Sequence, residues 1–188
     1  MRSKKQDLVQ FLSENGIDVC FLDETHLGTG QVFWMSNYVC HSSDCPTLGD
    51  DSAILVRRGI DHCTVPVSGL QQLETSVVRF KQGARPVKLV AIYLPPLHAM
   101  VDADLSASNA GGIRVLMAGN VNAKHHDWNS RVNSHRGIHC LRTGHTNHRS
   151  SLQTAWPWCP RYSGRPGLRP TGESNSILRT KFGLLTRS

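Results

Sequence analysis

The sequence predicts an α/β fold, in which helices pack on β-sheets. An amphipathic pattern over residues 4–15 ends at a glycine and is followed by a short apolar run at 17–22, as expected for a helix leading into a buried strand. Two alternating patterns, 73–80 and 87–93, flank a glycine bend and predict a hairpin. A further apolar run at 113–118 ends abruptly in polar residues. This mixture of elements is typical of layered α/β domains.

Size and composition indicate one globular domain. A chain of 188 residues can bury one core, and 39% hydrophobic and 19% charged residues fit that class. No apolar run reaches the roughly 18 residues of a membrane span, and the basic start, residues 1–5, does not lead into a signal-peptide core. We therefore expect an intracellular protein with no membrane partner.

The net charge of +7 is concentrated at one end of the chain. Residues 128–188 contain ten Lys and Arg but only one acidic residue, Glu173, whereas residues 1–127 contain 11 basic and 13 acidic residues. The second stretch therefore has the charge that nucleic-acid contacts require, and the first does not.

Each predicted element has its own local signal. The helix at 4–15 places four apolar residues on one face, and the strand at 17–22 ends in a polar pentapeptide. A strand is also expected at 52–57, and prolines stop the strand that ends at Tyr93. Residues 97–112 are weakly helical at most. The four apolar helix residues are Leu8, Val9, Phe11 and Leu12.

The strand at 113–118 leads into Gly119-Asn-Val-Asn122. Asn120 and Asn122 are two positions apart, so both amide side chains can project from one rim of the sheet. Ligand sites in α/β proteins lie at such strand ends. This rim is therefore the candidate site.

Cysteine and histidine spacing gives weaker metal signals. A zinc site using Cys40, His41 and Cys45 with His62 or Cys63 is conceivable, but the spacing matches no known ribbon or finger, so we expect free thiols. Two histidine pairs have helical spacing, but no convincing helix contains them, and surface histidines are favoured. They are His135 with His139, and His145 with His148.

The residues after the central strand resemble a known family. Metal-dependent phosphodiesterases of the endonuclease/exonuclease/phosphatase superfamily carry Gly-Asp-x-Asn at such a strand end. The endonuclease domain of jockey-like non-LTR retrotransposons extends it to Gly-Asp-x-Asn-Ala-Lys-His and then Trp-Asn-Ser-Arg. This chain has Asn120 in place of the aspartate. It keeps Gly119, Asn122, Ala123, Lys124, His125, Trp128, Asn129, Ser130 and Arg131. Glu24-Thr-His-Leu27 and Tyr93-Leu-Pro-Pro96 match two further motifs.

The resemblance implies a partial four-layer α/β sandwich, with two packed mixed or antiparallel sheets flanked by helices. It implies DNA nicking with Mg²⁺ (or Mn²⁺) and no other small-molecule cofactor, inside a polyprotein that is also an RNA-directed DNA polymerase. An active protein would then work in the nucleus. Glu24 would bind the metal, Tyr93 and Asn122 would contact the phosphate, and Lys124 and His125 would contact DNA. Without the resemblance, Glu24 could be a solvated loop acid and Tyr93 could simply pack its ring.

Three departures from the family pattern lead us to expect impaired hydrolysis. An amide at Asn120 cannot accept the proton that the family's aspartate handles, and losing a general base costs about 10² to 10⁴ in rate. The family's first strand, with a metal-binding asparagine, would precede residues 1–5, and the closing Ser-Asp-His motif does not occur. A frame-disrupted retroelement copy would have all three defects.

The chain is therefore expected to comprise an endonuclease-like domain at 1–140, lacking its first strand, and a basic Gly/Pro/Arg-rich irregular or disordered tail at 141–188. Three functions follow. The chain could nick DNA as an endonuclease, remain as a catalytically inactive remnant, or bind nucleic acid through its basic tail without catalysis.

Overall fold

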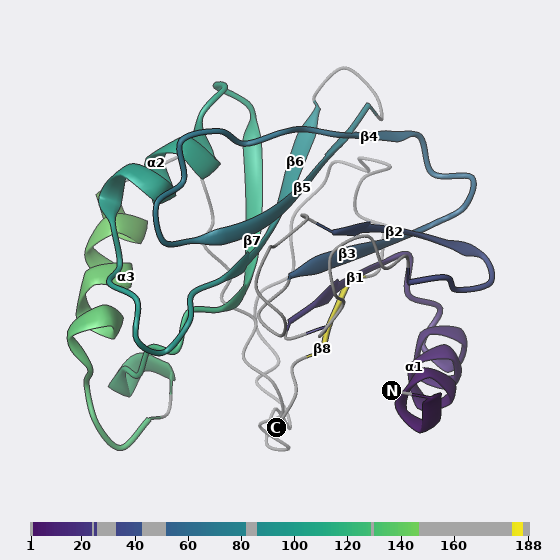
Figure 1. The fold of residues 1–188 in the computed structure, drawn as a ribbon, viewed down its shortest axis with the longest axis horizontal. Helices are drawn as coiled ribbons and strands as arrows, with labels where there is room; N and C mark the ends of the chain where they lie inside the picture. Colours follow the sequence, from purple (N-terminus) through teal and green to yellow (C-terminus); the bar gives the residue numbers. More distant parts are fainter. Residues whose placement is uncertain are drawn as a thin grey trace, which may run out of the picture.

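The structure is a computed structural model in which two sheets pack face to face between helices (Figure 1). α1 (Arg2–Glu14) covers the outer face of one sheet, and α2 (Asp102–Asn109) and α3 (His135–Thr146) lie on the outer side of the other. This confirms the predicted α/β class, and the layers are those of the α/β sandwich that the family resemblance implies. The structure describes residues 2–23, 25, 33–42, 52–81, 86–128, 130–146 and 182–185.

The first sheet has the order β2-β3-β1-β8. β1 runs antiparallel to β3, which runs antiparallel to β2, whereas β8 pairs with β1 in parallel. The bounds are β1 (Val19–Leu22), β2 (Tyr38–Ser42), β3 (Ala53–Arg57) and β8 (Phe182–Leu185).

The second sheet has the order β4-β5-β6-β7. β4, β5 and β6 form antiparallel pairs, which confirms the predicted hairpin of β5 and β6, and β7 is parallel to β6. The bounds are β4 (His62–Thr64), β5 (Glu74–Phe80), β6 (Val87–Tyr93) and β7 (Arg114–Asn120). A 3-10 turn, η1 (His126–Trp128), follows β7.

Apolar side chains fill the three spaces between the four layers. Alternation along the strands sends one set of residues between the sheets, including Phe21, Ile54 and Leu89, and the opposite set outward. On the outer face of the first sheet, Leu8 and Leu12 of α1 pack into a buried core. On the outer face of the second sheet, Leu105 of α2 and Cys140 of α3 do the same. Every layer therefore contributes to a core.

α1 buries less of its predicted apolar face than expected. Leu8 and Leu12, one helical turn apart, are buried, but Val9 and Phe11 are 42% and 37% exposed. The sheet contacts only the side of α1 that contains Leu8 and Leu12, so Val9 and Phe11 remain partly exposed at the edge of the contact. Gly16, with φ of +57°, ends the helix as predicted.

Two segments are more regular than the sequence predicts. Residues 97–112 contain α2, whose buried Asp104 carboxylate accepts backbone N–H groups of Gln71, Gln72 and Leu73 at 2.8–2.9 Å. Residues 141–146 continue α3, and Phe182–Leu185 forms β8; the rest of 141–188 lies outside the described residues. Tertiary contacts order these segments despite weak local patterns.

The described cysteines Cys20, Cys40, Cys63 and Cys140 are free thiols. Over the described residues, no helix combines the length and the apolar character of a membrane span.

Candidate active site

Polar side chains form a row across three adjacent strands of the second sheet. Glu74 of β5 pairs in register with Tyr93 of β6, which pairs in register with Asn120 of β7. Alternation relative to the apolar residues of the same strands that lie between the sheets places all three on the face toward the other sheet. Neighbouring strands lie about 4.8 Å apart, so the row runs along one rim of the sandwich.

Asn120 and Asn122 close a tight turn where β7 ends. The Asn120 Oδ1 accepts the Asn122 backbone N–H at 2.9 Å, and Asn122 has a left-handed φ of +48°, which asparagine tolerates better than most residues. The Asn122 Nδ2 donates to the Leu94 carbonyl at 2.9 Å, and the Leu94 N–H donates to the Asn120 carbonyl at 3.0 Å. The turn is thereby fixed to the end of β6.

Gly119 allows β7 to enter this turn. Its φ is +150°, and a Cβ at this position would lie 1.8 Å from the Ile92 carbonyl oxygen of β6. No side chain larger than hydrogen fits there without moving one of the strands. The glycine in the motif is therefore required by the backbone around the site.

The facing sheet brings further polar residues to the same end of the sandwich. Asp23 and Thr25 follow β1, and each is 5% exposed. Ser52, just before β3, donates from its Oγ to the Ala91 carbonyl at 3.4 Å, while Ser76 of β5 donates to the Ser52 carbonyl at 2.7 Å. Hydrogen bonds therefore join the two sheets close to the row. Glu24, the expected metal ligand, lies outside the described residues.

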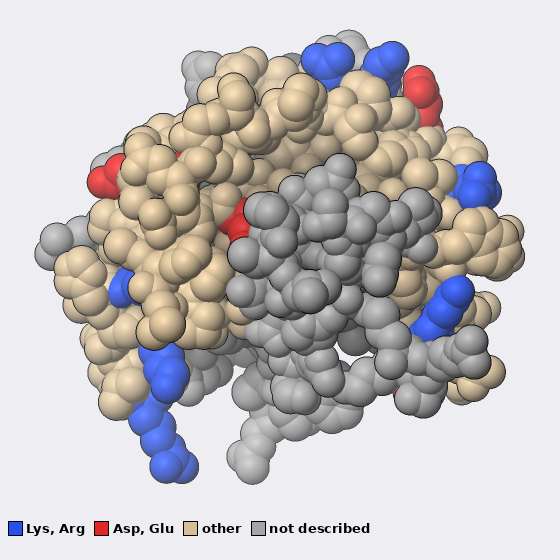
Figure 2. Space-filling model, in the orientation of Figure 1, with Lys and Arg blue, Asp and Glu red and all other residues tan. Residues whose placement is uncertain are grey.

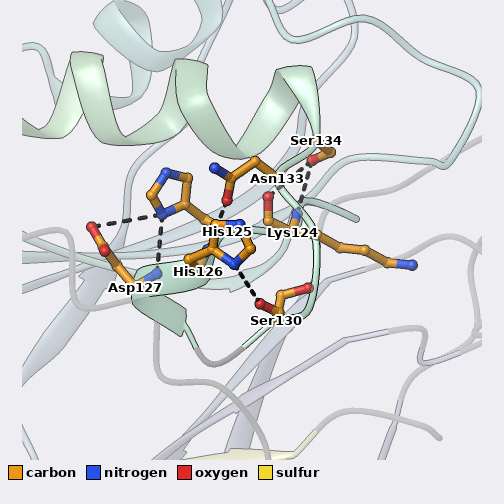
Figure 3. A network of polar contacts seen from close by, with 7 residues as sticks. All are labelled: Lys124, His125, His126, Asp127, Ser130, Asn133 and Ser134. Carbon is orange, nitrogen blue, oxygen red and sulfur yellow. Dashed lines mark hydrogen bonds and ion pairs between the residues drawn. The ribbon is translucent and has the colours of Figure 1, made fainter.

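The loop after β7 folds into a network of polar contacts (Figure 3). Ser134 caps α3 by accepting the Gly137 N–H at 3.1 Å, and it also accepts the Lys124 backbone N–H at 2.9 Å. The Lys124 side chain is exposed and points away from this network. Lys124 is therefore held by its backbone while its ammonium group remains available to a ligand.

His125 is arranged differently from Lys124. Its side chain is only 15% exposed, and its Nδ1 lies 3.1 Å from the Asp127 backbone nitrogen and 3.6 Å from the Asp127 Oδ2. The backbone N–H of the neighbouring His126 donates to the Asn133 Oδ1 at 2.8 Å, and the His126 Nδ1 lies 3.0 Å from the Ser130 carbonyl oxygen. His125 therefore orders the loop in this structure, in addition to the DNA contact expected of it.

Basic side chains of the described residues do not gather into one patch on the face seen in Figure 2. Lys and Arg lie apart from one another around its rim. In that view, the described domain offers isolated cations rather than a continuous basic stripe. This agrees with the charge distribution along the sequence.

The described residues of the rim do not by themselves form a divalent-metal site. Mg²⁺ prefers carboxylate and carbonyl oxygens. Within the described ranges, no group of three or more His, Cys, Asp or Glu side chains could hold a metal ion. The aspartate position of the motif carries an amide whose oxygen already accepts the Asn122 N–H. The described part of the rim therefore does not by itself fit Mg²⁺.

The structure brings together most of the residues singled out from the sequence. Tyr93, Asn120 and Asn122 share the rim, and Lys124 and His125 start the following loop. Glu74 was missed, although the alternation of its strand places it on the same face as Phe80. Its register with Tyr93 depends on the hairpin pairing, which the alternation alone does not give.

Comparison with known proteins identifies similar sequences. The profile described as the Endonuclease/Exonuclease/phosphatase family matches residues 1–171. The RNA-directed DNA polymerase from mobile element jockey of Drosophila funebris is 31% identical over 133 residues, which are 68% of this chain and 14% of the relative. Its counterpart from Drosophila melanogaster is 26% identical over 135 residues, 70% of this chain and 15% of the relative. The chain thus spans about a seventh of these relatives.

A solved structure shares the fold. The endonuclease domain of TRAS1, a telomere-specific non-LTR retrotransposon, superimposes with a TM-score of 0.60 at 18% identity, covering 76% of this chain and 64% of that domain.

Proposed function

The chain belongs to the endonuclease/exonuclease/phosphatase family, and from this membership we propose that it is a retrotransposon-type endonuclease domain that contacts DNA but hydrolyses it slowly. The substrate class is the DNA phosphodiester, and the cellular setting is the nucleus if the target is chromosomal. Two observations support this assignment: the sequence similarity to RNA-directed DNA polymerases from mobile element jockey, and the polar rim of the sandwich.

Phosphate recognition is assigned to the side chains that can donate hydrogen bonds at this rim. A tyrosine hydroxyl and an asparagine amide are both donors to phosphate oxygens. Tyr93 and Asn122 come from adjacent segments that hydrogen bonds hold in place, so neither needs to be ordered when a substrate binds. Lys124 adds a cation in the loop that follows, with His125 beside it.

The expectation of slow hydrolysis depends on one observation, the hydrogen bonding of the Asn120 side chain. Its Oδ1 accepts the Asn122 N–H, and the other end of the amide is an NH₂ group, which cannot take a proton from water. A carboxylate in the same place would keep the hydrogen bond with one oxygen and offer the second to a water molecule. The rate loss expected for a missing base is about 10² to 10⁴.

A divalent cation, Mg²⁺ or Mn²⁺, is the cofactor that family membership suggests, and Glu24 is its expected ligand. The donors among the described residues do not complete such a site. The described residues would therefore only bind and orient the phosphate.

The test is nicking of supercoiled plasmid in Mg²⁺ by the chain as it stands and by Asn120→Asp. Asn37→Asp is the matched control, because it makes the same isosteric change at an exposed asparagine away from the rim, just before β2. We expect nicking to rise about 10²-fold or more in Asn120→Asp only. Glu24→Ala in the Asn120→Asp background should abolish it, as should EDTA.

Two results would contradict parts of this proposal. Equal, EDTA-sensitive nicking by the original chain and by Asn120→Asp would show that Asn120 is no lesion. If neither protein nicks plasmid nor binds duplex DNA, the chain is an inactive remnant. If neither nicks and both bind, replacing Arg161, Arg165 and Arg169 by glutamine, which leaves α3 and β8 in place, tests whether the basic tail is responsible, since such binding should also fall steeply with salt.

A further inference from the structure

Two histidines from different sheets meet at the edge of the sandwich opposite β7. β2 and β4 are each the outermost strand of their sheet, and His41 of β2 lies against His62 of β4. Their Nε2 atoms are 2.7 Å apart. We propose that this pair is a binding site for a divalent transition-metal cation of the Zn²⁺ class, separate from the phosphodiester rim.

The backbone around His62 prepares its Nε2 for a metal. The His62 Nδ1 lies 2.6 Å from the Ile60 carbonyl oxygen, which can only accept a hydrogen bond, so Nδ1 carries the ring proton. The Nε2 lone pair of a neutral His62 then points at His41. Metal-binding histidines commonly donate their second ring N–H to a backbone carbonyl in this way, which fixes both the tautomer and the ring orientation.

His41 is suited to the same role. Its ring is partly buried between the sheets, and desolvation, together with the adjacent His62, lowers its pKa below the ordinary value. A neutral imidazole is the form that binds metal. In the metal-free protein, one proton shared between the two Nε2 atoms accounts for their close approach.

The approach of the two rings needs little adjustment to hold a cation. Zn–N bonds of about 2.0–2.1 Å at tetrahedral angles place two ligating nitrogens roughly 3.3 Å apart. The two Nε2 atoms would therefore separate by less than about 1 Å from their present 2.7 Å. The rings meet edge to face, at an interplanar angle of 84°, so their lone pairs can converge on one point without stacking.

The pair also selects the type of cation. Imidazole nitrogen favours Zn²⁺ and its transition-metal neighbours, whereas Mg²⁺ favours oxygen. Cys40 packs with the core beneath α1 rather than beside His41, so among the described members of the zinc set considered from sequence, the structure joins the two histidines. Cys45 lies outside the described residues. Among the described residues no third His, Cys, Asp or Glu joins the pair, so water would fill the other coordination positions.

The location separates this site from the proposed catalytic rim. β4 and β7 are at opposite edges of the second sheet. His62 also pairs with Phe80, at the opposite end of β5 from Glu74. Metal bound here should therefore leave the row of Glu74, Tyr93 and Asn120 untouched.

The experiment is calorimetric titration of the chain, without an affinity tag, with Zn²⁺ and separately with Mg²⁺. His41→Gln and His62→Gln each remove one ligand, and His98→Gln removes an exposed histidine elsewhere as the matched control. Loss of an outer-shell partner alone costs about 10- to 100-fold in affinity, so loss of a ligand should cost at least tenfold. Circular dichroism checks that each variant is folded.

We expect one saturable Zn²⁺ site in the original chain and in His98→Gln, weakened in the other two variants and not occupied by Mg²⁺. Equal Zn²⁺ affinity in all four proteins, or no saturable binding by the original chain, would overturn the proposal. A second readout needs no variant. Co²⁺ added to the original chain should perturb the His41 and His62 ring resonances most, and perturbation centred on other histidines would also overturn it.

Discussion

Tyr93 and Asn120 lie directly opposite each other where β6 and β7 end in parallel. The pairing places a hydroxyl and an amide side by side at the rim of the sandwich, and the Asn122 side chain closes the turn by donating to Leu94. The strand pairing itself thus assembles the polar groups. A change of one side chain can therefore alter the chemistry of the rim without altering its shape.

The first prediction concerns this turn. Asn120→Asp keeps an acceptor for the Asn122 N–H and should leave the free energy of unfolding nearly unchanged, whereas Asn120→Ala should lower it by about 1 kcal/mol. Urea denaturation followed by circular dichroism measures both. Equal losses for the two variants would mean that the Asn120 oxygen does not stabilise the turn.

A second prediction concerns Gly137 in the first turn of α3. Glycine-to-alanine changes in a helix usually stabilise it by about 1 kcal/mol. Here the new Cβ would lie 2.0 Å from the Lys124 carbonyl oxygen, so we expect a net loss of about 2 kcal/mol instead. Gln6→Ala on the exposed side of α1 is the control for a helical substitution to alanine.

Thermal denaturation measures the stability of these proteins, and hydrogen exchange at Lys124 and Ser134 shows whether α3 has moved away from the loop. A Gly137→Ala protein that is more stable than the original would show that α3 can shift without cost.

The sequence predicted the elements with strong local periodicity and missed those that depend on distant contacts. β1, β5, β6 and β7 have apolar runs bounded by polar or glycine residues, so their positions and the polar rim could be predicted. β8 pairs with β1 although the two strands lie far apart in the sequence, and no local sequence pattern can predict such a pairing.

α3 and the histidine pair were missed for related reasons. α3 contains Gly137 and several histidines, which are poor helix formers, but Ser134 caps it and Cys140 packs it into the core. The sequence grouped His41 and His62 only as two members of a possible zinc set. Their convergence arises because edge strands of different sheets meet, which the spacing of the two residues cannot reveal.

A third prediction concerns the Asp104 carboxylate. It is 1% exposed and accepts three consecutive backbone N–H groups at Gln71, Gln72 and Leu73. Asp104→Ala leaves the buried Leu73 N–H and the two partly buried donors without their acceptor and should lower the free energy of unfolding by about 2 kcal/mol, because a buried unsatisfied donor costs about 1–3 kcal/mol. Ser106→Ala, exposed on the same helix, is the control.

Asp104→Asn separates charge from shape in this interaction. An amide oxygen in the Oδ2 position keeps the bonds from Gln72 and Leu73, and only the Gln71 N–H then faces the NH₂ group. The loss of stability in urea should therefore be smaller than that of Asp104→Ala. A loss below about 1 kcal/mol in both variants would show that water replaces the carboxylate.

The last prediction concerns thiol reactivity and pH. Burial, with a smaller contribution from the nearby Asp23 carboxylate, raises the pKa of the Cys20 thiol to about 12, and burial raises the pKa of Cys40 and Cys140 to about 11. The thiolate is the form that reacts with alkylating agents. In the folded protein at pH 8.5, iodoacetamide should therefore leave these three cysteines unmodified, and urea should expose all of them.

The raised pKa of Cys20 also makes the stability of the fold depend on pH. Unfolded Cys20 ionises near its ordinary pKa of 9.0, whereas the folded thiol stays protonated up to about 12. The stabilisation from a neutral buried thiol is therefore complete below pH 9 and is lost as the pH rises through this window. Cys20→Ala should show a shallower decline in unfolding free energy above pH 9 than the original chain. Rapid alkylation of native Cys20, or identical pH profiles for the two proteins, would contradict the burial of this thiol.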